Sequence, residues 1–174
     1  MVINSTFIKD LYVIKYGKFE DLRGELVKFY NYDKLAEINL FPIFKETWFT
    51  KSNKNVIRAM HMQVGEKACV KLVTAINGSV KDVILDTRQN FETFGKYFEI
   101  TLDAQQPTAL YIPIGCAHGY KVMKKNSIVL YMASEVHSAK DDVGYRWDSF
   151  GYNWEVINPI MSERDKKLPL FREN

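Results

Sequence analysis

The chain has 174 residues, the length of one domain, and we expect a single domain over residues 1–174. Hydrophobic residues make up 47% and aromatic residues 14%, which is enough for a sizeable core and is typical of a β-architecture with ring-lined pockets. A net charge of +3 without a long basic run argues against a nucleic-acid partner, but does not oppose an anionic small ligand. Lys9 and Asp10 interrupt the N-terminal stretch, which therefore does not resemble a signal peptide, and no apolar run approaches the roughly 20 residues of a membrane span. We expect no membrane partner and a cytoplasmic enzyme or binding protein.

Short runs rich in Val, Ile, Tyr and Phe, separated by Gly, Asn or Asp, predict β-strands along most of the chain. In chain order the predicted strands are Leu11–Tyr16, Glu25–Tyr30, Phe44–Thr50, Val56–Gln63, Ala68–Ile76, Val80–Asp86, Lys96–Leu102, Thr108–Ile112, Gly119–Met123 and Ile128–Val136. Their spacing of roughly 8–12 residues is typical of a sandwich or a barrel. We therefore expect an all-β fold, a β-barrel of the jelly-roll type with short helices.

Turn and helix signals separate these strands. Asn77-Gly78 predicts a hairpin turn, and Pro113-Ile114-Gly115 predicts another bend. Helical pattern is scarce, and only Asp33–Ile38 and Ser162–Lys166 predict a turn or two of helix. We expect the first residue of each, Asp33 and Ser162, to be its N-cap.

The predicted strand Val56–Gln63 carries two polar residues, Arg58 and His61, among apolar neighbours. Strict alternation places them on opposite faces of a sheet. They can reach one cavity only if the strand bulges near Ala59, and bulges do occur beside active sites. Taken alone, His61 also fits a structural histidine with satisfied hydrogen bonds.

Four further polar residues have both a structural and a functional interpretation. Lys71 lies between apolar neighbours, so it either faces solvent on an edge strand or meets an anion or oxygen acceptor inside. His118 follows a tight turn between small residues, which leaves room for its ring to face a pocket. By composition alone, Tyr131 is an ordinary core tyrosine and Asp165 an ordinary surface acid.

Cofactor and metal motifs are missing from the sequence. There is no Gly-rich dinucleotide fingerprint and no phosphate loop, so we expect no cofactor. Ala59 and Gln63 lie two positions either side of His61, so the H-x-H pattern of a metal-binding barrel is absent and we expect no metal. Cys69 and Cys116 sit in apolar surroundings and predict buried, reduced thiols.

From about Phe19 to about Pro169 the chain resembles the dTDP-4-dehydrorhamnose 3,5-epimerase family, a branch of the cupin barrels. The residues that carry the resemblance are Asp21-Leu22-Arg23-Gly24, Asn55 to Gln63, Lys71-Leu72-Val73, Gly78 to Val83 with Asp86 and Arg88, Thr93-Phe94-Gly95, Ile112-Pro113, Ala117 to Tyr120, Leu130-Tyr131, Trp147 and Ser162 to Asp165. Each motif is weak alone, but in this order and with nearly family-like spacing the set is specific.

The resemblance implies a role for each matching residue. His61 is implied as the base, Asp165 as its partner and Tyr131 as the proton donor. Lys71 and His118 are implied to bind near the sugar carbonyl. Arg23 and Arg58 are implied to hold the diphosphate of the substrate, a nucleotide-diphospho-sugar. We expect five further residues to bind the substrate, namely Lys28, Glu46, Trp48, Asp142 and Arg164.

These residue types suit the inversion of a carbon next to a ketone. Proton removal there needs stabilisation of the oxyanion that forms, which Lys71 or His118 can supply in a dry barrel. A histidine base works near neutral pH, and a carboxylate on its other ring nitrogen fixes its tautomer. A separate acid on the opposite face, Tyr131, then delivers the proton that inverts the carbon. The implied activity is epimerisation of carbon 3, carbon 5 or both of a 4-keto-6-deoxy sugar, without a redox cofactor.

The chain departs from the family where the base is bound. The family commonly has Q-D-N where this chain has Glu46-Thr47-Trp48, and Glu where it has Lys28. A carboxylate at Glu46 can accept from the exocyclic amine of cytosine or guanine, and Trp48 can stack on a ring, so we expect a CDP- or GDP-linked sugar to be preferred over a dTDP-linked one. Ala59 before the base histidine and Val136-His137 after the tyrosine also differ, which bears on the number of carbons inverted.

Other functions remain open from the sequence. Within enzymes, the alternative is an epimerase of carbon 3 alone or carbon 5 alone; outside them, a metal-dependent cupin or a non-catalytic sugar-binding barrel. The segment Met1–Asp10 has apolar residues but no obvious place in a lone barrel. Together with the resemblance, it predicts a homodimer that exchanges strands across its interface.

Overall fold

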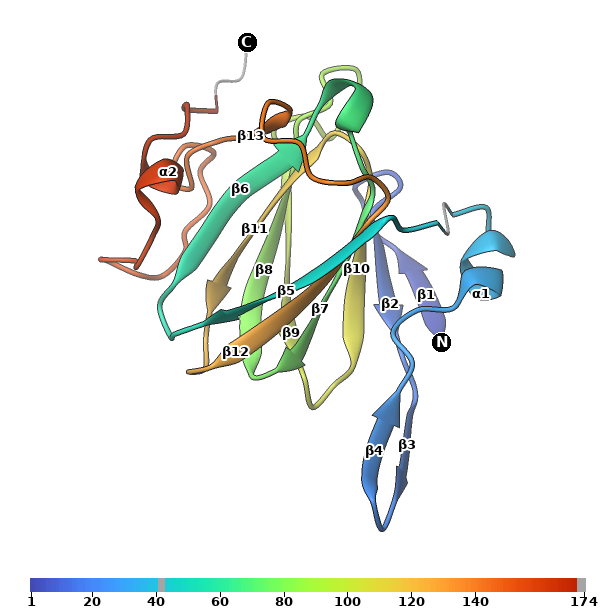
Figure 1. Cartoon of the computed structure of the whole chain (residues 1–174). Helices are drawn as coiled ribbons and strands as arrows, with labels where there is room; N and C mark the ends of the chain where they lie inside the picture. The colour runs from blue at the N-terminus through green and yellow to red at the C-terminus, as the bar shows by residue number, and fades with distance from the viewer. Residues whose placement is uncertain (41–42, 172–174) are drawn as a thin grey trace.

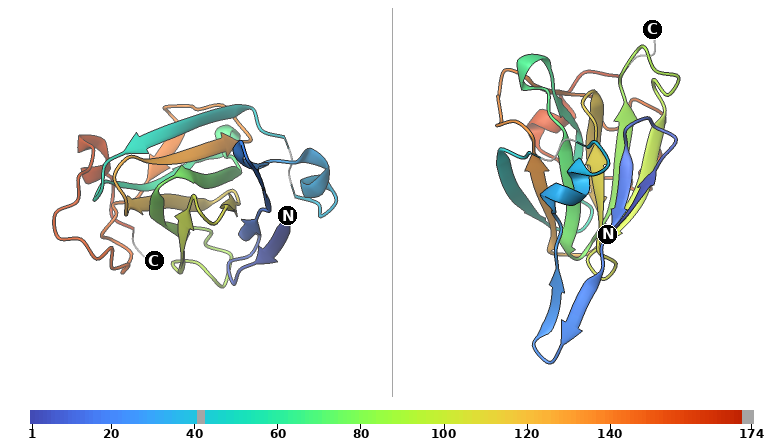
Figure 2. Two further views of the ribbon diagram at one scale, coloured as in Figure 1. Left: turned by 90° about the horizontal axis from the view of Figure 1, so that it is seen from below. Right: turned by 90° about the vertical axis from the view of Figure 1, so that its right-hand side faces the viewer.

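The structure is a computed structural model, and it describes residues 1–40 and 43–171. Two antiparallel sheets face each other in the described chain (Figure 1; Figure 2, left). The first has six strands in the order β1 (Val2–Ser5), β2 (Tyr12–Lys15), β10 (Thr108–Ile112), β7 (Lys71–Asn77), β12 (Ser127–Ala133) and β5 (Glu46–Ser52). The second has five in the order β13 (Asp142–Gly144), β6 (Ile57–Gln63), β11 (Cys116–Val122), β8 (Ser79–Asp86) and β9 (Tyr97–Asp103). This arrangement confirms the predicted all-β, jelly-roll fold.

The main apolar core lies between the two sheets, because alternate residues of each strand turn inward. In β12 the buried positions are Ser127, Val129, Tyr131 and Ala133, which places Tyr131 on the inner face. Val73 and Val129 from the first sheet meet Ile84 from the second in the same buried cluster. The inner face therefore both holds the sheets together and carries polar site residues among apolar ones.

The two short helices lie outside the sheets. Helix α1 spans Tyr32–Ala36, and its N-cap is Asn31, whose side chain accepts a hydrogen bond from the Lys34 N–H at 3.1 Å. The predicted N-cap, Asp33, is wrong because it lies inside the first turn, while the extended backbone that a cap requires occurs at Asn31. Helix α2 spans Glu163–Lys166 with Ser162 as its N-cap, as predicted. A short 3₁₀ turn covers Gly65–Lys67.

Both predicted turns are confirmed. Gly78 joins β7 to β8 with a φ of 73°, and the bend after Pro113 joins β10 to β11, with Gly115 at a φ of 80°. A Cβ at Gly78 would lie 2.9 Å from the backbone of Ser127, so both the conformation and the close approach require glycine there.

Three strands were not predicted, namely β1, β13 and β3 (Lys18–Asp21). The predicted strand Glu25–Tyr30 is shorter and begins earlier, as β4 (Gly24–Val27). β1 pairs with β2, so the N-terminal segment has a place in its own barrel, which corrects the expectation that it has none. The signal was weak because these strands are short and mostly exposed.

The hairpin of β3 and β4 projects from the body of the molecule (Figure 1; Figure 2, right). All of its residues except the partly buried Val27 are exposed, including the large apolar side chains of Phe19, Leu22 and Leu26. An arm of this kind buries little of its apolar surface within its own chain.

Within the described residues, no helix is long and apolar enough to cross a membrane. Cys69 and Cys116 are both buried and free, as predicted. Burial raises the pKa of the Cys116 thiol to about 12, so this residue remains a protonated core side chain.

Candidate active site

A bulge in β6 brings Arg58 and His61 to the same face. In the pairing with β11, His61 lies opposite His118 and Arg58 lies opposite Tyr120, so β6 contains one residue more than its partner between these two pairs. Met60 exchanges both backbone hydrogen bonds with Tyr145, at 2.9 and 3.0 Å, instead of joining the ladder with β11. The bulge near Ala59 that the sequence required is therefore confirmed, and both polar side chains share the face of His118 and Tyr120.

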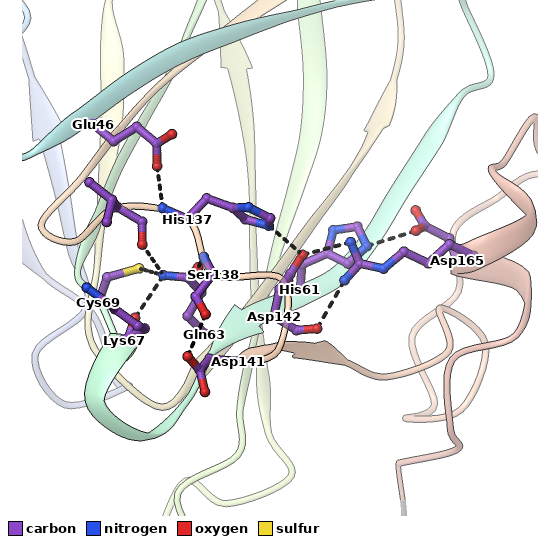
Figure 3. A network of polar contacts seen from close by, with 12 residues as sticks. Glu46, His61, Gln63, Lys67, Cys69, His137, Ser138, Asp141, Asp142 and Asp165 are labelled. Atoms are coloured by element: carbon purple, nitrogen blue, oxygen red, sulfur yellow. Dashed lines mark hydrogen bonds and ion pairs between the residues drawn. The ribbon is translucent and has the colours of Figure 1, made fainter.

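His61 and Asp165 form a direct pair. The ring Nε2 of His61 lies 2.9 Å from Oδ1 of Asp165, which reaches it from α2 and is 5% exposed (Figure 3). Burial opposes ionisation of Asp165, but hydrogen bonds from His61, from Ser162 and from the backbone of Ala59 outweigh it and hold its pKa below the ordinary value. The hydroxyl of Ser162 also accepts from the backbone N–H of Asp165 at 3.1 Å, so the same serine caps the helix and lowers the pKa of the carboxylate. Asp165 is not the surface acid that composition suggested.

With Nε2 on a carboxylate, Nδ1 of His61 is the nitrogen that is available as a base. The ring is 25% exposed, so a substrate can reach it. This is the geometry of a histidine base with an orienting carboxylate.

A second such pair, His118 with Asp82, lies deeper in the barrel. Nε2 of His118 is 2.9 Å from Oδ2 of Asp82, whose side chain is 0% exposed. Burial raises the pKa of Asp82, although the neighbouring imidazole lowers it in part. Sequence reasoning missed this role of Asp82; the signal was an acid in the otherwise buried strand β8.

Tyr131 lies on the inner face of β12 against two rings. Trp48 of β5 stacks on it face to face, with centroids 4.9 Å apart and planes at 4°. His118 meets it edge-on at 5.8 Å. Burial raises the pKa of Tyr131 well above 10, so the phenol keeps its proton near neutral pH and is suited to donate it.

A cavity of about 370 Å³ opens at Trp48, the ring that stacks on Tyr131. Its lining is Glu46, Trp48, Gln63, Cys69, Lys71, Ala133, Glu135, His137 and Asp142. Lys71 lies in β7, between β10 and β12, so the edge-strand interpretation is wrong. Its Nζ donates to the backbone carbonyl of His61 at 3.4 Å, and burial lowers its pKa. The lysine therefore connects the cavity to the backbone of the candidate base.

Asp142 occupies the wall between two histidines (Figure 3). Its Oδ2 accepts from Arg164 Nη1 at 2.7 Å and lies 3.3 Å from Nε2 of His137. Burial raises the pKa of Asp142, but Arg164, His137 and the charge of His61 outweigh it and lower the pKa overall. Asp142 and Arg164, both predicted to bind substrate, thus form one structural unit.

The same view shows how His137 is held, a residue that the predicted site set omitted. Its backbone N–H donates to Oε2 of Glu46 at 2.7 Å, and the next N–H, of Ser138, donates to Gln63 at 2.7 Å (Figure 3). One oxygen of Glu46 is thus engaged within the protein, as is one face of Trp48 on Tyr131. Both residues line the cavity with Lys71. Because each already has a partner within the protein, the argument that Glu46 accepts from a base amine and that Trp48 stacks on the base is weaker than the sequence suggested.

Arg23 and Lys28 are not brought to this cavity by their own chain. Arg23 stands at the tip of the β3–β4 hairpin, 89% exposed, with its guanidinium on Asp21 at 2.5 Å. Both cations line a separate cavity of about 500 Å³ along the hairpin, with Phe19 and Leu26. Arg58, by contrast, lies on β6 on the same face as His61, and its Nε donates to Ser52 of β5 at 3.1 Å.

Comparisons with known proteins match this chain over almost its whole length. The family model for dTDP-4-dehydrorhamnose 3,5-epimerase matches residues 5–173. The chain belongs to the dTDP-4-dehydrorhamnose 3,5-epimerase family. This confirms the predicted family and the predicted class of enzyme, an epimerase of nucleotide sugars.

Individual relatives agree. The dTDP-4-dehydrorhamnose 3,5-epimerase of Salmonella typhimurium is 33% identical over 98% of this chain and 95% of its own length. That of Escherichia coli is 31% identical over 97% and 93%. A crystal structure of the Bacillus anthracis enzyme, with TDP and PPi bound, superposes with a TM-score of 0.94 at 31% identity, covering 98% of this chain and 99% of the other.

Within residues 1–40 and 43–171, no group of three or more His, Cys, Asp or Glu side chains is placed to hold a metal ion.

Proposed function

We propose that this epimerase inverts the carbons next to the ketone of a nucleotide-diphospho-4-keto-6-deoxy sugar, with His61 as base and Tyr131 as acid. The observation that carries the proposal is the 2.9 Å contact between His61 and the ionised, buried Asp165, beside a cavity that contains Lys71. An ordinary core histidine does not need this combination of a reachable ring nitrogen and a buried carboxylate.

The first step transfers the proton of the carbon to Nδ1 of His61. The electron pair of the broken C–H bond moves into the ring and onto the ketone oxygen, which gives an enolate. Asp165 stabilises the positive charge that appears on the imidazole. Lys71 Nζ, and His118 held by Asp82, are the groups that offer hydrogen-bond donors for the negative oxygen.

In the second step Tyr131 donates its proton to the same carbon from the opposite face. The O–H bond breaks, a new C–H bond forms and the ketone is restored with inverted configuration. His61 then loses its proton to solvent, and the phenolate of Tyr131 regains one. Because burial raises the pKa of Tyr131, the phenol is protonated again before the next turnover.

The diphosphate of the substrate requires cations, and Lys71, which we assign to the ketone oxygen, is the one lysine or arginine in the described lining of the cavity. Arg58 lies on β6 beside His61, whereas Arg23 and Lys28 line the separate cavity along the β3–β4 hairpin. We assign these two to the diphosphate of a substrate bound by a second copy, within a homodimer in which the hairpin packs on the partner. The exposed Phe19, Leu22 and Leu26 supply apolar contacts for such an interface. Light scattering at micromolar concentration tests this assignment: a monomer would contradict it.

For the base, the family and the TDP-bound relative favour a dTDP-linked sugar. The contacts of Glu46 with His137 and of Trp48 with Tyr131 weaken the sequence argument for cytosine or guanine.

The enzyme acts in the cytoplasm, and its two free, buried cysteines suit a reducing compartment.

The test is incubation with dTDP-, CDP- and GDP-linked 4-keto-6-deoxy sugars in deuterium oxide, read by mass spectrometry and NMR. We expect deuterium at carbon 3, carbon 5 or both, fastest for the dTDP sugar, and the number of exchanged carbons separates double from single epimerisation. Fastest turnover of the CDP- or GDP-linked sugar would instead support Glu46 as the acceptor for the exocyclic amine of the base. Absence of exchange with all three would refute the proposed function.

A further inference from the structure

Helix α2, which carries Asp165, is too short to be stable alone. It spans Glu163–Lys166, a single turn, and a helix of this length has too few hydrogen bonds to offset the cost of forming it. The place of Asp165 therefore depends on contacts with the rest of the chain. The base and its carboxylate lie 104 positions apart in sequence, so local structure does not fix the 2.9 Å contact between them.

The backbone on either side of α2 is anchored near the start of β6 and just after β13. Before the helix, Ile160 bonds to the backbone of Asn55 and Ile57, with both N–O distances 3.0 Å. After it, the carbonyl of Pro169 accepts from the N–H of Arg146 at 2.7 Å. These anchors fix where the segment begins and ends, but not how the helix is turned between them.

Arg164 connects the helix to strand β13 by two bonds. Its Nη1 lies 2.7 Å from Oδ2 of Asp142, and its Nη2 donates to the backbone carbonyl of the same residue at 3.2 Å. The side chain of Asp142 is only 13% exposed. Two bonds from one planar guanidinium to one residue fix the direction of the arginine as well as its reach.

The two contacts of the helix reach neighbouring strands. β13 pairs with β6, and its Gly144 lies opposite His61. Arg164 and Asp165 are consecutive, so their side chains leave the helix about 100° apart, one toward β13 and the other toward the base on β6. With the contact to His61 alone, the helix could turn about that contact. The bonds of Arg164 remove this freedom.

We propose that Arg164 is a positioning residue, whose clamp on Asp142 holds α2 so that Asp165 meets the ring nitrogen of His61. The proposal rests on the proposed function, in which His61 removes the proton. It gives Arg164 a task other than the substrate contact expected from the sequence. A substrate contact would contribute to KM, whereas the clamp acts on the rate of proton removal at saturating substrate.

The first experiment measures deuterium exchange into the dTDP-linked 4-keto-6-deoxy sugar over a range of its concentrations. In Arg164→Met we expect the rate at saturation to fall about tenfold, because a misplaced carboxylate stabilises the imidazolium less, with KM within about twofold of wild type. Arg164→Lys keeps the charge but cannot make both bonds, so its rate should fall about threefold. Lys166→Met is the matched control, since it removes from the same helix a cation that is 51% exposed, as Arg164 is. We expect it to exchange at the wild-type rate.

A double variant tests whether Arg164 acts through Asp165. In Asp165→Asn the side chain has no charge to present to the base, so its exact place matters less. Adding Arg164→Met to that variant should lower exchange by less than about twofold. A second tenfold loss there would mean that Arg164 acts by another route, and would refute the clamp.

Nitrogen-15 NMR of the histidine rings tests the clamp without substrate, because it reports which ring nitrogen carries the proton. With Asp165 in place, the proton of the neutral His61 ring lies on Nε2. We expect that single tautomer in wild type and in Lys166→Met, and a mixture of tautomers in Arg164→Met. The chain has three histidines, and the signals of His61 are identified by their loss in His61→Ala.

A rate in Arg164→Met within about threefold of wild type, a raised KM with an unchanged rate, or an unchanged tautomer of His61 would each overturn the proposal. Wild-type exchange by Arg164→Lys would also overturn it, since the charge alone would then suffice. This variant decides if thermal melting shows that Arg164→Met does not fold. Failure of the proposed function has a different signature, because wild type would not exchange while the tautomers would still report on the clamp.

Discussion

Replacing Asp165 by Asn removes a charge while keeping the shape of the side chain. At 2.9 Å in surroundings of intermediate dielectric, attraction between the carboxylate and a protonated His61 is about 6 kcal/mol. The amide dipole and entering water recover part of this, since the ring is 25% exposed. We therefore expect the barrier to proton removal to rise by about 3–4 kcal/mol, a fall in exchange of roughly 10²–10³-fold.

The assay is deuterium exchange into the keto sugar at saturating substrate, with thermal melting to verify the fold. Glu163→Gln is the matched control, because it makes the same change of carboxylate to amide in the same helix, at an exposed residue whose one ion pair within the described residues is with Lys166. We expect it to exchange at the wild-type rate. If Asp165→Asn retains more than a tenth of wild-type exchange, Asp165 is not the electrostatic partner of the base.

Three other variants test separate links in the argument. His61→Ala should abolish exchange with the fold intact, and retention of more than about a tenth would remove it as base. Tyr131→Phe should retain exchange but yield little inverted sugar; equal loss of both would indicate a different task for the phenol. Asp86 is buried, but hydrogen bonds from Arg88 and Thr93 overcome the effect of burial and lower its pKa, so its contribution to stability is present above about pH 4 and is lost as the pH falls through its folded pKa. Asp86→Asn should therefore cost about 3 kcal/mol in urea unfolding at pH 7 and less at pH 3, and an unchanged difference would refute the ionic explanation.

The fold was predictable from the sequence because strand periodicity and the Asn-Gly turn are local signals. The bulge in β6 was also predictable, since Arg58 and His61 could share a cavity in no other way. Strands β1 and β3 were not, because four-residue strands with exposed side chains lack a hydrophobic period.

For the site, the resemblance to a family supplied what the residues alone could not. Asp165 meets His61 across 104 positions of sequence, and local composition carries no signal for such a contact. Asp82 was missed for the same reason, since its partner His118 lies on another strand. Glu46 and Trp48 line one cavity with Lys71, but the sequence did not reveal that other residues of the protein contact them, the N–H of His137 for Glu46 and the ring of Tyr131 for Trp48.

The surroundings of the histidines, of which the chain has three, decide which of them can be the base. His61 and His118 each lie 2.9 Å from an aspartate, so distance does not distinguish them. The partner of His61 has a lowered pKa and stays ionised, which supports a positive charge on the ring. The partner of His118 is completely buried with a raised pKa, which disfavours a separated pair of charges and leaves His118 suited to donating a hydrogen bond.

His137 also meets an aspartate, at 3.3 Å, but the charge of Asp142 is already taken up by Arg164 at 2.7 Å. A proton on His137 would therefore gain less from the carboxylate than one on His61 does from Asp165. His61 alone of the three combines a reachable nitrogen with an ionised carboxylate that has no arginine or lysine bonded to it among the described residues. For this reason we assign proton removal to His61. We assign the other two histidines to substrate binding, His118 as a hydrogen-bond donor and His137 as part of the cavity wall.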